Sequence, residues 1–458
     1  MKDSVANKIT YDVIIVGGGI TGASILYLLS NYSDLKNVLL IEKYGDLASL
    51  NSNASNNAQT LHTGDIETNY TLEHSKQVKE ASERIIRYTD SLELKERNSI
   101  IKNCQKMVLA VDDEEINILN KNYDSGLGKL YPGLKKIGKK QLEKLEPNVV
   151  KKRDPNEKVF ALLSDNGHMV DFGRLTHSFV QNSKKHKILK TNVLLNTKVL
   201  SIRGNDGKYI VKTNKDTHHG KFVIFASGTY SLYFAKSLGY DKNLSILSVG
   251  GGFYTAPRVL RGKVYRVQIG GIPFAAIHGD PDFNNKNIVR FGPTVTIPPL
   301  LERHHLETFA DYIKSFDFDL PTMISLKRIL LNKDIRRIIS RNMLYGVPVI
   351  GKPYFLKMEA ARIVPSLKSE NLKFNNNLGG IRPQIIDENK KSLLFGAGKI
   401  KEEGLIFNIT PSPGASSCLQ SALEDVVTVT RHLNKNFNVD RFEKELGPIE
   451  SKNILNML

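Results

Sequence analysis

Residues 11–42, YDVIIVGGGITGASILYLLSNYSDLKNVLLIE, decide how this chain folds. Asp12 to Val16 is a short β-branched run that ends in glycine, which is typical of a buried parallel strand. Gly17, Gly19 and Gly22 then have the G-x-G-x-x-G spacing, which allows a tight turn, a close approach of backbone to a pyrophosphate and close packing of the next helix. The pattern predicts that helix over residues 20–31, with its positive end facing phosphate.

The second strand of this unit is expected at Val38 to Ile41, and Glu42 follows it. An acid about 20 residues beyond the last glycine accepts hydrogen bonds from a ribose diol and repels a 2′-phosphate. A βαβ unit whose glycines serve only tight packing is the alternative. Three glycines together with the acid favour a dinucleotide site.

The chain has 458 residues, a length typical of an enzyme, and 40% of them are apolar. We expect a chain of this length to form two interleaved domains. No apolar stretch is long enough to span a bilayer, and the N-terminus has no signal core. Cys104 and Cys418 offer no disulfide framework, which suits a reducing cytoplasm. The net charge of +18 favours a carboxylate substrate, an anionic lipid surface or nucleic acid, although lysine-rich composition throughout the chain is an alternative explanation.

Further along, the hydrophobic pattern predicts helices at 72–92 and 171–183 and a β-hairpin turning at Asn205-Asp206-Gly207. A buried run from Phe222 to Ala226 ends at Gly228 and returns the chain to the nucleotide sheet. Residues 245–298 are expected to form antiparallel strands, the floor of a second domain. After a helical insert at 301–343, residues 377–410 return to strands, and the loop TPSPGASS then opens a helix with free backbone N–H groups.

The last helix of the insert is basic and amphipathic. Asn332 is its expected N-cap, Ile335, Ile338 and Ile339 share one face, and Arg337 and Arg341 lie on another. An anionic membrane surface would suit such a helix, and an ordinary surface helix has the same pattern.

Together these features resemble FAD-dependent enzymes built like D-amino-acid oxidase and glycerol-3-phosphate dehydrogenase. Within that group the chain is similar to the malate:quinone oxidoreductase family over nearly its whole length. The matching stretches are SNNAQTLHTGDIETNYT (55–71), HMVDFGRLT (168–176), GKVYRVQ (262–268), HGDPD (278–282), VRFGPT (289–294), GGIRPQII (379–386) and TPSPGASS (410–417). Gln59 and Leu61 depart from the pattern, since glycines are expected there.

The resemblance implies an α/β fold in which a Rossmann-like FAD-binding domain is interleaved with an α+β substrate domain on a mostly antiparallel sheet. We expect residues 1–100, 155–248 and 376–440 in the FAD domain, 101–154 and 249–375 in the substrate domain, and 441–458 as a C-terminal tail. FAD is expected rather than NAD, because a second, nicotinamide-binding glycine fingerprint is absent. The residues expected to contact FAD are Gly17, Gly19, Gly22, Glu42, Asn57, Thr60, Val199, Gly228, Gly414, Ala415 and Ser416, with Asn56 a further candidate.

Oxidation of a 2-hydroxy acid needs a base for the hydroxyl proton and a cation for the carboxylate. Arg382 matches the family's carboxylate clamp, whose planar fork suits that group, although it could instead pair with Asp387. His278 is expected to be the base, oriented by Asp280 or Asp282, with His62 as the substitute.

Malate carries a second carboxylate, which needs a second cation. Alternation along the strand puts Lys263 and Tyr265 on one face and Arg266 on the other, so only one of the two cations reaches the pocket. Lys263 is the first choice for this cation, with Tyr265 beside it.

The family resemblance implies oxidation of (S)-malate to oxaloacetate, with electrons passed to a membrane quinone by a cytoplasmic protein bound peripherally to the inner face of the cell membrane. Another 2-hydroxy acid, chiefly L-2-hydroxyglutarate, is the nearest alternative substrate. A tRNA-modifying flavoprotein is a third possibility, suggested by the charge. It is disfavoured because the basic residues are dispersed and no zinc spacing or RNA-binding motif is present, so no metal and no nucleic acid are expected.

Overall fold

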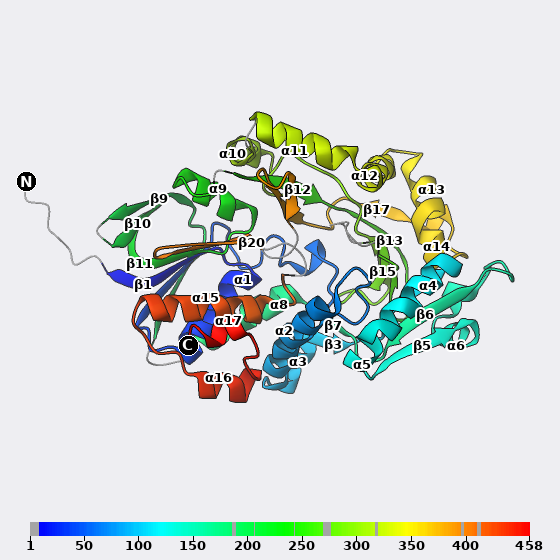
Figure 1. The fold of residues 1–458 in the computed structure, drawn as a ribbon, viewed down its shortest axis with the longest axis horizontal. Coiled ribbons are helices and arrows are strands. Elements are labelled where there is room, and N and C mark those ends of the chain that lie inside the picture. Colours follow the sequence, from blue (N-terminus) through cyan, green and yellow to red (C-terminus); the bar gives the residue numbers. More distant parts are fainter. Residues whose placement is uncertain are drawn as a thin grey trace, which may run out of the picture.

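The computed structural model describes residues 9–185, 189–205, 207–241, 243–268, 276–316, 319–394, 398–409 and 414–458. Figure 1 shows two regions side by side, one around β1 and the other around β6. Parts of four expected features lie outside the described residues: Asp206 of the hairpin turn, residues 273–275 and 395–397 of two expected strands, and residues 410–413 of the loop TPSPGASS.

The first sheet is centred on β1 (Thr10–Val16), which pairs in parallel with β2 (Asn37–Ile41) and β11 (Thr217–Phe225). Val16 is opposite both Ile41 and Phe225, so the carboxyl ends of these strands meet at one edge of the sheet. Ligands bind at this edge in open α/β sheets. The remaining strands of the sheet are β8 (Lys190–Leu194), β9 (Val199–Asn205), β10 (Lys208–Thr213), β20 (Gly398–Glu402) and β21 (Leu405–Ile409).

The helix α1 (Ile20–Tyr32) follows the glycine turn, one residue longer than predicted. Its side chains form a core with α8 (Phe172–Ser183) and α15 (Cys418–His432), where Tyr27 and Phe179 stack with ring centroids 5.3 Å apart. Other helices of this region are α2 (Leu72–Asp90), α3 (Leu94–Ile100), α9 (Thr229–Ser237), α16 (Val439–Leu446) and α17 (Lys452–Leu455).

The C-terminal segment belongs to this first region. Phe442, Leu446 and Ile454 are buried in the same core as α1, and Arg84 of α2 donates hydrogen bonds to the carbonyls of residues 446–448. The expected tail at 441–458 therefore packs as part of the nucleotide-binding region.

The second sheet runs in the order β17-β13-β16-β15-β14-β4-β6-β5. Its described pairs are antiparallel except for β14 with β4, where Lys263 lies opposite Lys106. Its strands are β4 (Lys106–Val111), β5 (Leu134–Gly138), β6 (Val159–Ser164), β13 (Phe253–Pro257), β14 (Lys263–Arg266), β15 (His278–Pro281), β16 (Ile288–Gly292) and β17 (Lys373–Asn375). The helices of this region are α4 (Asp113–Asn122), α5 (Gly128–Leu130), α6 (Lys139–Leu145), α7 (Pro147–Val150), α13 (Gly351–Phe355) and α14 (Ala361–Ile363).

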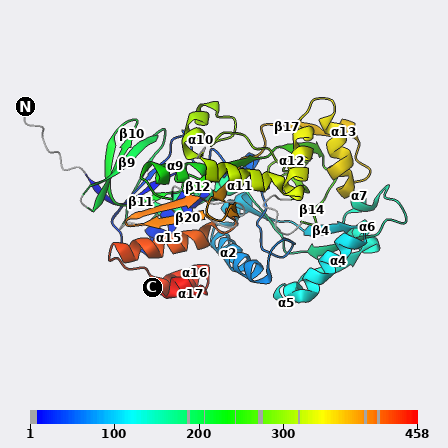
Figure 2. The same ribbon diagram turned by 45° about the horizontal axis from the view of Figure 1, so that its top comes forward.

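A smaller sheet, β12-β18-β19, carries Arg382 on its middle strand. Its strands are β12 (Leu244–Gly250), β18 (Ile381–Asp387) and β19 (Ser392–Leu394), and a separate pair joins β3 (Ile101–Asn103) with β7 (His168–Val170). The helical insert consists of α10 (Phe309–Ser315), α11 (Leu320–Leu331) and α12 (Lys333–Tyr345). Its helices α11 and α12 lie along the top edge in Figure 1 and cross the front of the molecule in Figure 2. The Asn332 side chain accepts hydrogen bonds from the backbone of Asp334 and Ile335, which confirms the predicted N-cap.

The packing of α1 on β1 depends on Gly22, because a Cβ there would lie 2.0 Å from the Gly17 carbonyl oxygen. We expect Gly22→Ala to lower the free energy of unfolding by about 1–3 kcal/mol or more, as overpacking does. Gly204→Ala is the control, since its Cβ would meet only Tyr209 at 3.9 Å. Denaturant unfolding of the two variants measures the difference, and equal stability would mean that Gly22 is not needed for close packing.

Candidate functional site

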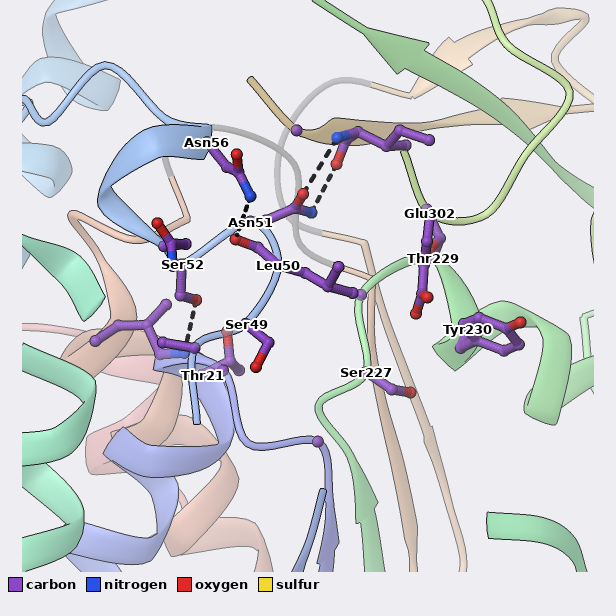
Figure 3. A pocket seen from close by; sticks show the side chains of 18 of the residues that line it. Thr21, Ser49, Leu50, Asn51, Ser52, Asn56, Ser227, Thr229, Tyr230 and Glu302 are labelled. Atoms are coloured by element: carbon purple, nitrogen blue, oxygen red, sulfur yellow. Dashed lines mark hydrogen bonds between the residues drawn. The ribbon is translucent and has the colours of Figure 1, made fainter. Parts of the chain in front are cut away.

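A cavity of about 660 Å³ runs from the glycine turn after β1 to the strand that carries Arg382. Its volume lies within the range of small-molecule and cofactor sites. In Figure 3, Ser49, Leu50, Asn51 and Ser52 form one wall, and Ser227, Thr229, Tyr230 and Glu302 form the facing wall. The cavity therefore lies at the carboxyl edge of the first sheet, as the sequence predicted.

The glycine turn opens into the cavity at Gly17 and Gly19, whereas Gly22 supports the turn from behind. Gly17 has a φ of +116°, and a Cβ there would lie 2.5 Å from the Ala226 carbonyl oxygen. Only glycine fits both demands. Ser52 Oγ accepts a hydrogen bond of 2.9 Å from the Ile20 backbone N–H at the start of α1, a contact that sequence analysis missed.

Glu42 lines the cavity directly after β2. Its carboxylate accepts hydrogen bonds from the backbone N–H groups of Gly18 at 2.6 Å and Tyr44 at 2.8 Å, and burial raises its pKa. Each carboxylate oxygen keeps a second lone pair for a ribose hydroxyl. Val199 and Gly228 line the same end of the cavity, as expected.

The asparagine-rich loop after β2 is held in shape by its own amides. The Asn51 side chain donates to the Ile381 carbonyl at 2.7 Å and accepts from the Ile381 N–H at 3.1 Å, which ties the loop to β18. Asn56 donates to the Leu50 carbonyl and Asn57 to the Asn53 carbonyl. Sequence analysis did not single out Asn51, although its place between a nucleotide strand and the matched motif was a signal.

Gln59 takes a left-handed conformation with a φ of +53°, which explains why a glycine is expected at this position. Its side chain compensates for the strain by donating to the Ala54 carbonyl at 3.0 Å and accepting from the Phe283 N–H at 2.8 Å. Leu61, the other departure, is fully buried in the core around α1.

At the far end of the cavity, His62 Nδ1 lies 2.7 Å from Glu67 Oε1. The His62 backbone N–H donates to Ser416 Oγ at 2.9 Å, which joins this loop to the start of α15. Burial alone would raise the pKa of Glu67, but the hydrogen bond to His62 and nearby positive charges hold it below its usual value. Thr60, His62, Gly414, Ala415 and Ser416 all line the cavity here.

Arg382 also lines this end of the cavity and is partly buried. Among the described residues, no carboxylate or carbonyl is hydrogen-bonded to its guanidinium, and burial lowers its pKa. The alternative pairing with Asp387 is absent from the described part of the chain, because Asp387 lies 3.7 Å from Lys390 instead. Arg382 is thus placed to bind an anion that enters the cavity.

The three other expected site residues lie behind this wall. Lys263, Tyr265 and His278 are buried and do not line the cavity in the described part of the chain. The Lys263 ammonium donates to the Ala58 carbonyl at 2.8 Å and lies 3.2 Å from Asp280. Lys263 was expected to reach the cavity, but it does not. Tyr265 Oη lies 2.7 Å from Thr60 Oγ1.

His278 is only 2% exposed, with its Nδ1 3.2 Å from Asp280 and its ring centroid 4.5 Å from that of Tyr265. Burial lowers its pKa to about 4. Of the two acids expected to orient His278, Asp280 is the one that lies near it, whereas Asp282 pairs with Arg290. The expected alternation along β14 is confirmed, because Arg266 faces the other way and pairs with Glu359 at 2.5 Å.

The cavity fits FAD. Two of its lining residues have a buried polar atom without a partner among the described residues, Asn408 Oδ1 and Arg303 Nη1, and both can meet polar groups of a ligand. A glycine turn at a helix N-terminus, an acid after the second strand and a long cavity leading to a second sheet define an FAD-dependent oxidoreductase.

Comparison with known proteins gives the family. A sequence model described as "Malate:quinone oxidoreductase (Mqo)" matches residues 9–450. The chain is 38% identical over 447 residues to a probable malate:quinone oxidoreductase of Campylobacter jejuni, covering 95% of this chain and 99% of the relative. It is also 38% identical over 454 residues to malate:quinone oxidoreductase of Helicobacter pylori 26695, covering 97% and 99%.

Among solved structures, L-alpha-glycerophosphate oxidase of Mycoplasma pneumoniae with FAD bound has a TM-score of 0.64 and 21% identity, covering 93% of this chain and 95% of the other. This likeness confirms the fold class. The chain belongs to the malate:quinone oxidoreductase family, and its cofactor is FAD.

The buried Lys263–Asp280 pair gives a test of what Lys263 does. We expect Lys263→Met to lower the free energy of unfolding by about 3–5 kcal/mol, because it leaves a buried carboxylate without its cation. The double variant Lys263→Met/Asp280→Leu should recover much of this loss. Denaturant unfolding of the FAD-bound protein measures both. Unchanged stability of Lys263→Met with a raised KM would instead place Lys263 against the substrate.

Proposed function

We propose that this chain oxidises (S)-malate to oxaloacetate and passes the electrons to a quinone. The observation that carries the proposal is that Arg382 and His62 line the same cavity. Among the described residues the Arg382 guanidinium has no carboxylate partner, whereas His62 has one in Glu67. Both groups are what hydride abstraction from a 2-hydroxy acid requires.

In this proposal Arg382 binds the carboxylate beside the reacting carbon. A guanidinium presents two parallel N–H donors to a carboxylate, which fixes the orientation of the acid as well as its position. Glu67 and Asp280 have partners of their own, His62 and Lys263 respectively.

His62 takes the hydroxyl proton as the substrate carbon loses its hydride, and the Glu67 carboxylate stabilises the imidazolium that forms. The bound FAD supplies the two-electron acceptor for this oxidation. His278 was the first choice for this base, but among the described residues His62 lines the cavity and His278 does not. A candidate base must come within hydrogen-bond reach of the proton, so geometry favours His62.

Tyr265, Lys263 and His278 are positioning residues in this scheme. Lys263 holds the Ala58 carbonyl and Tyr265 holds the Thr60 hydroxyl, and the His278 ring packs against Tyr265. Together they fix residues 58–62, which end at the proposed base.

Gly17, Gly19, Glu42, Val199 and Gly228 are proposed to hold the nucleotide half of FAD, with Asn57 and Thr60 further along. Gly414, Ala415 and Ser416 precede α15 and are proposed to lie beside the flavin half of FAD. All of these residues line the cavity, which supports the assignment.

A membrane quinone as acceptor requires the enzyme to work at a bilayer. Within the described residues, no helix is long and apolar enough to cross one. We therefore propose peripheral binding at the inner face of the cell membrane, supported by the net charge of +18.

Arg382→Ala tests the substrate-binding role. Loss of a charged hydrogen bond is worth about 1.5–3 kcal/mol, so we expect the KM for malate to rise roughly 10- to 150-fold while FAD stays bound. Arg203→Ala, at an exposed arginine on β9, is the control. Steady-state kinetics with a water-soluble quinone and the flavin absorbance measure both effects. An unchanged KM, or loss of FAD, would remove Arg382 from the substrate site.

His62→Gln tests the base. We expect kcat to fall about 10²- to 10⁴-fold, the usual contribution of a positioned base, and the acidic limb of the kcat/KM profile to disappear. His278→Gln is the matched variant and should cost much less while keeping that limb. The reverse result would make His278 the base and assign His62 a lesser role.

A further inference from the structure

Exposed apolar side chains gather on one part of the molecule. Of the 20 large hydrophobic residues exposed in the described part of the chain, 13 lie between Leu306 and Ile350. Between Leu320 and Ile350 the most exposed are Val349 at 91%, Leu320 at 73% and Met343 at 68%. We call the surface formed by α11, α12 and residues 346–350 the α11–α12 face.

This apolar surface is separate from what the helices need for folding. In α11, Thr322, Ser325 and Ile329 are buried against the core, while Met323, Ile324 and Leu331 point outward. In α12, Ile335 is buried and Ile338 and Ile339 pack partly on the same core, while Met343 and Leu344 are exposed. Large apolar residues exposed together on helices that contact one another mark an interaction site.

The charge of the same segment is one-sided. Residues 320–358 contain one acid, Asp334, and a larger set of basic residues: Lys327, Arg328, Lys333, Arg336, Arg337, Arg341, Lys352 and Lys357. Figure 1 shows α11 and α12 along the top edge of the molecule and α16 at the bottom edge, and in Figure 2 α16 and α17 lie together at the lower side. Apolar residues bordered by Lys and Arg on surface helices are what an anionic bilayer binds.

The tip of the face has a further feature. Val349 adopts a φ of +68°, a left-handed conformation that a β-branched residue rarely takes, and so presents its side chain at the end of the turn between α12 and α13. Strain of this kind persists at functional positions.

We propose that the α11–α12 face docks on an anionic lipid bilayer, with Leu331, Met343 and Val349 entering the boundary of the acyl chains and the basic side chains meeting lipid phosphates. The proposal rests on the proposed quinone reaction, since it names the surface that brings this enzyme to its acceptor. The helix α11 packs against β18, the strand that carries Arg382, so the docked face is one layer away from the substrate end of the cavity.

The test is co-sedimentation of the FAD-bound protein with two kinds of vesicle, one of phosphatidylcholine alone and one in which about one lipid in three is phosphatidylglycerol. We expect binding only to the anionic vesicles, weakened by salt. Arg336→Gln/Arg337→Gln should weaken it at least tenfold, because each basic residue near such a surface is worth roughly fivefold. Val349→Asp should weaken it as well.

Lys444→Gln/Lys452→Gln is the matched control. It removes the same charge from exposed positions on α16 and α17, which lie away from the α11–α12 face, and should leave vesicle binding unchanged. Flavin absorbance and thermal unfolding establish that each variant is folded.

The proposal is overturned if the wild-type protein does not bind anionic vesicles, or if the α16–α17 control loses as much vesicle binding as Arg336→Gln/Arg337→Gln. It is also overturned if the protein is a dimer that Val349→Asp converts to a monomer, because the α11–α12 face would then bind a second copy of the chain. Malate oxidation with a water-soluble quinone is measured in parallel. If that reaction persists without vesicle binding, the docking proposal fails and the proposed function stands. If vesicles are bound but malate is not oxidised, the proposed function fails and the docking surface stands.

Discussion

The Arg382 guanidinium, held at the cavity wall without a carboxylate partner in the described part of the chain, is the constraint on which the site depends. Removing a charge from water is costly unless it is paired, and the lowered pKa of Arg382 reflects that cost. A substrate carboxylate relieves it on binding. Three buried acids of this region have other partners, since His62 lies 2.7 Å from Glu67 and two buried lysines pair with Asp65 and Asp280.

Those lysines also show how the two regions of the chain form one site. Lys106 and Lys263 lie opposite each other on β4 and β14, and each contacts the segment that follows the nucleotide loop, Lys106 through Thr63 and Asp65 and Lys263 through the Ala58 carbonyl. On the other side, the Asn51 side chain ties the same loop to β18. The proposed base at His62 is therefore positioned by both the substrate sheet and the strand that carries Arg382.

Sequence predicted the local parts of this arrangement well. The β1–α1–β2 unit, the acid at Glu42 and the N-cap at Asn332 each follow from residues close together in the chain, where turn chemistry and hydrophobic period are decisive.

Alternation along β14 correctly separated Lys263 from Arg266. Alternation could not show whether a side chain reaches the cavity, because a strand residue on the face of the site can either line the cavity or support the wall behind it. That difference came from the parallel pairing of β14 with β4, a contact between residues about 157 positions apart, and from Asp280 on β15. For the same reason, the residues next to His62 and His278 in the sequence could not show which of the two histidines lines the cavity.

The central claim is that this chain holds FAD beside a carboxylate bound by Arg382. The most direct test is the absorption spectrum of the purified, FAD-bound protein after malate is added without air. The flavin absorbance near its visible maximum should bleach with malate, far less with lactate or L-2-hydroxyglutarate, and return when a quinone is added. A colourless protein that does not take up FAD, or a bound flavin that malate leaves oxidised, would contradict the account.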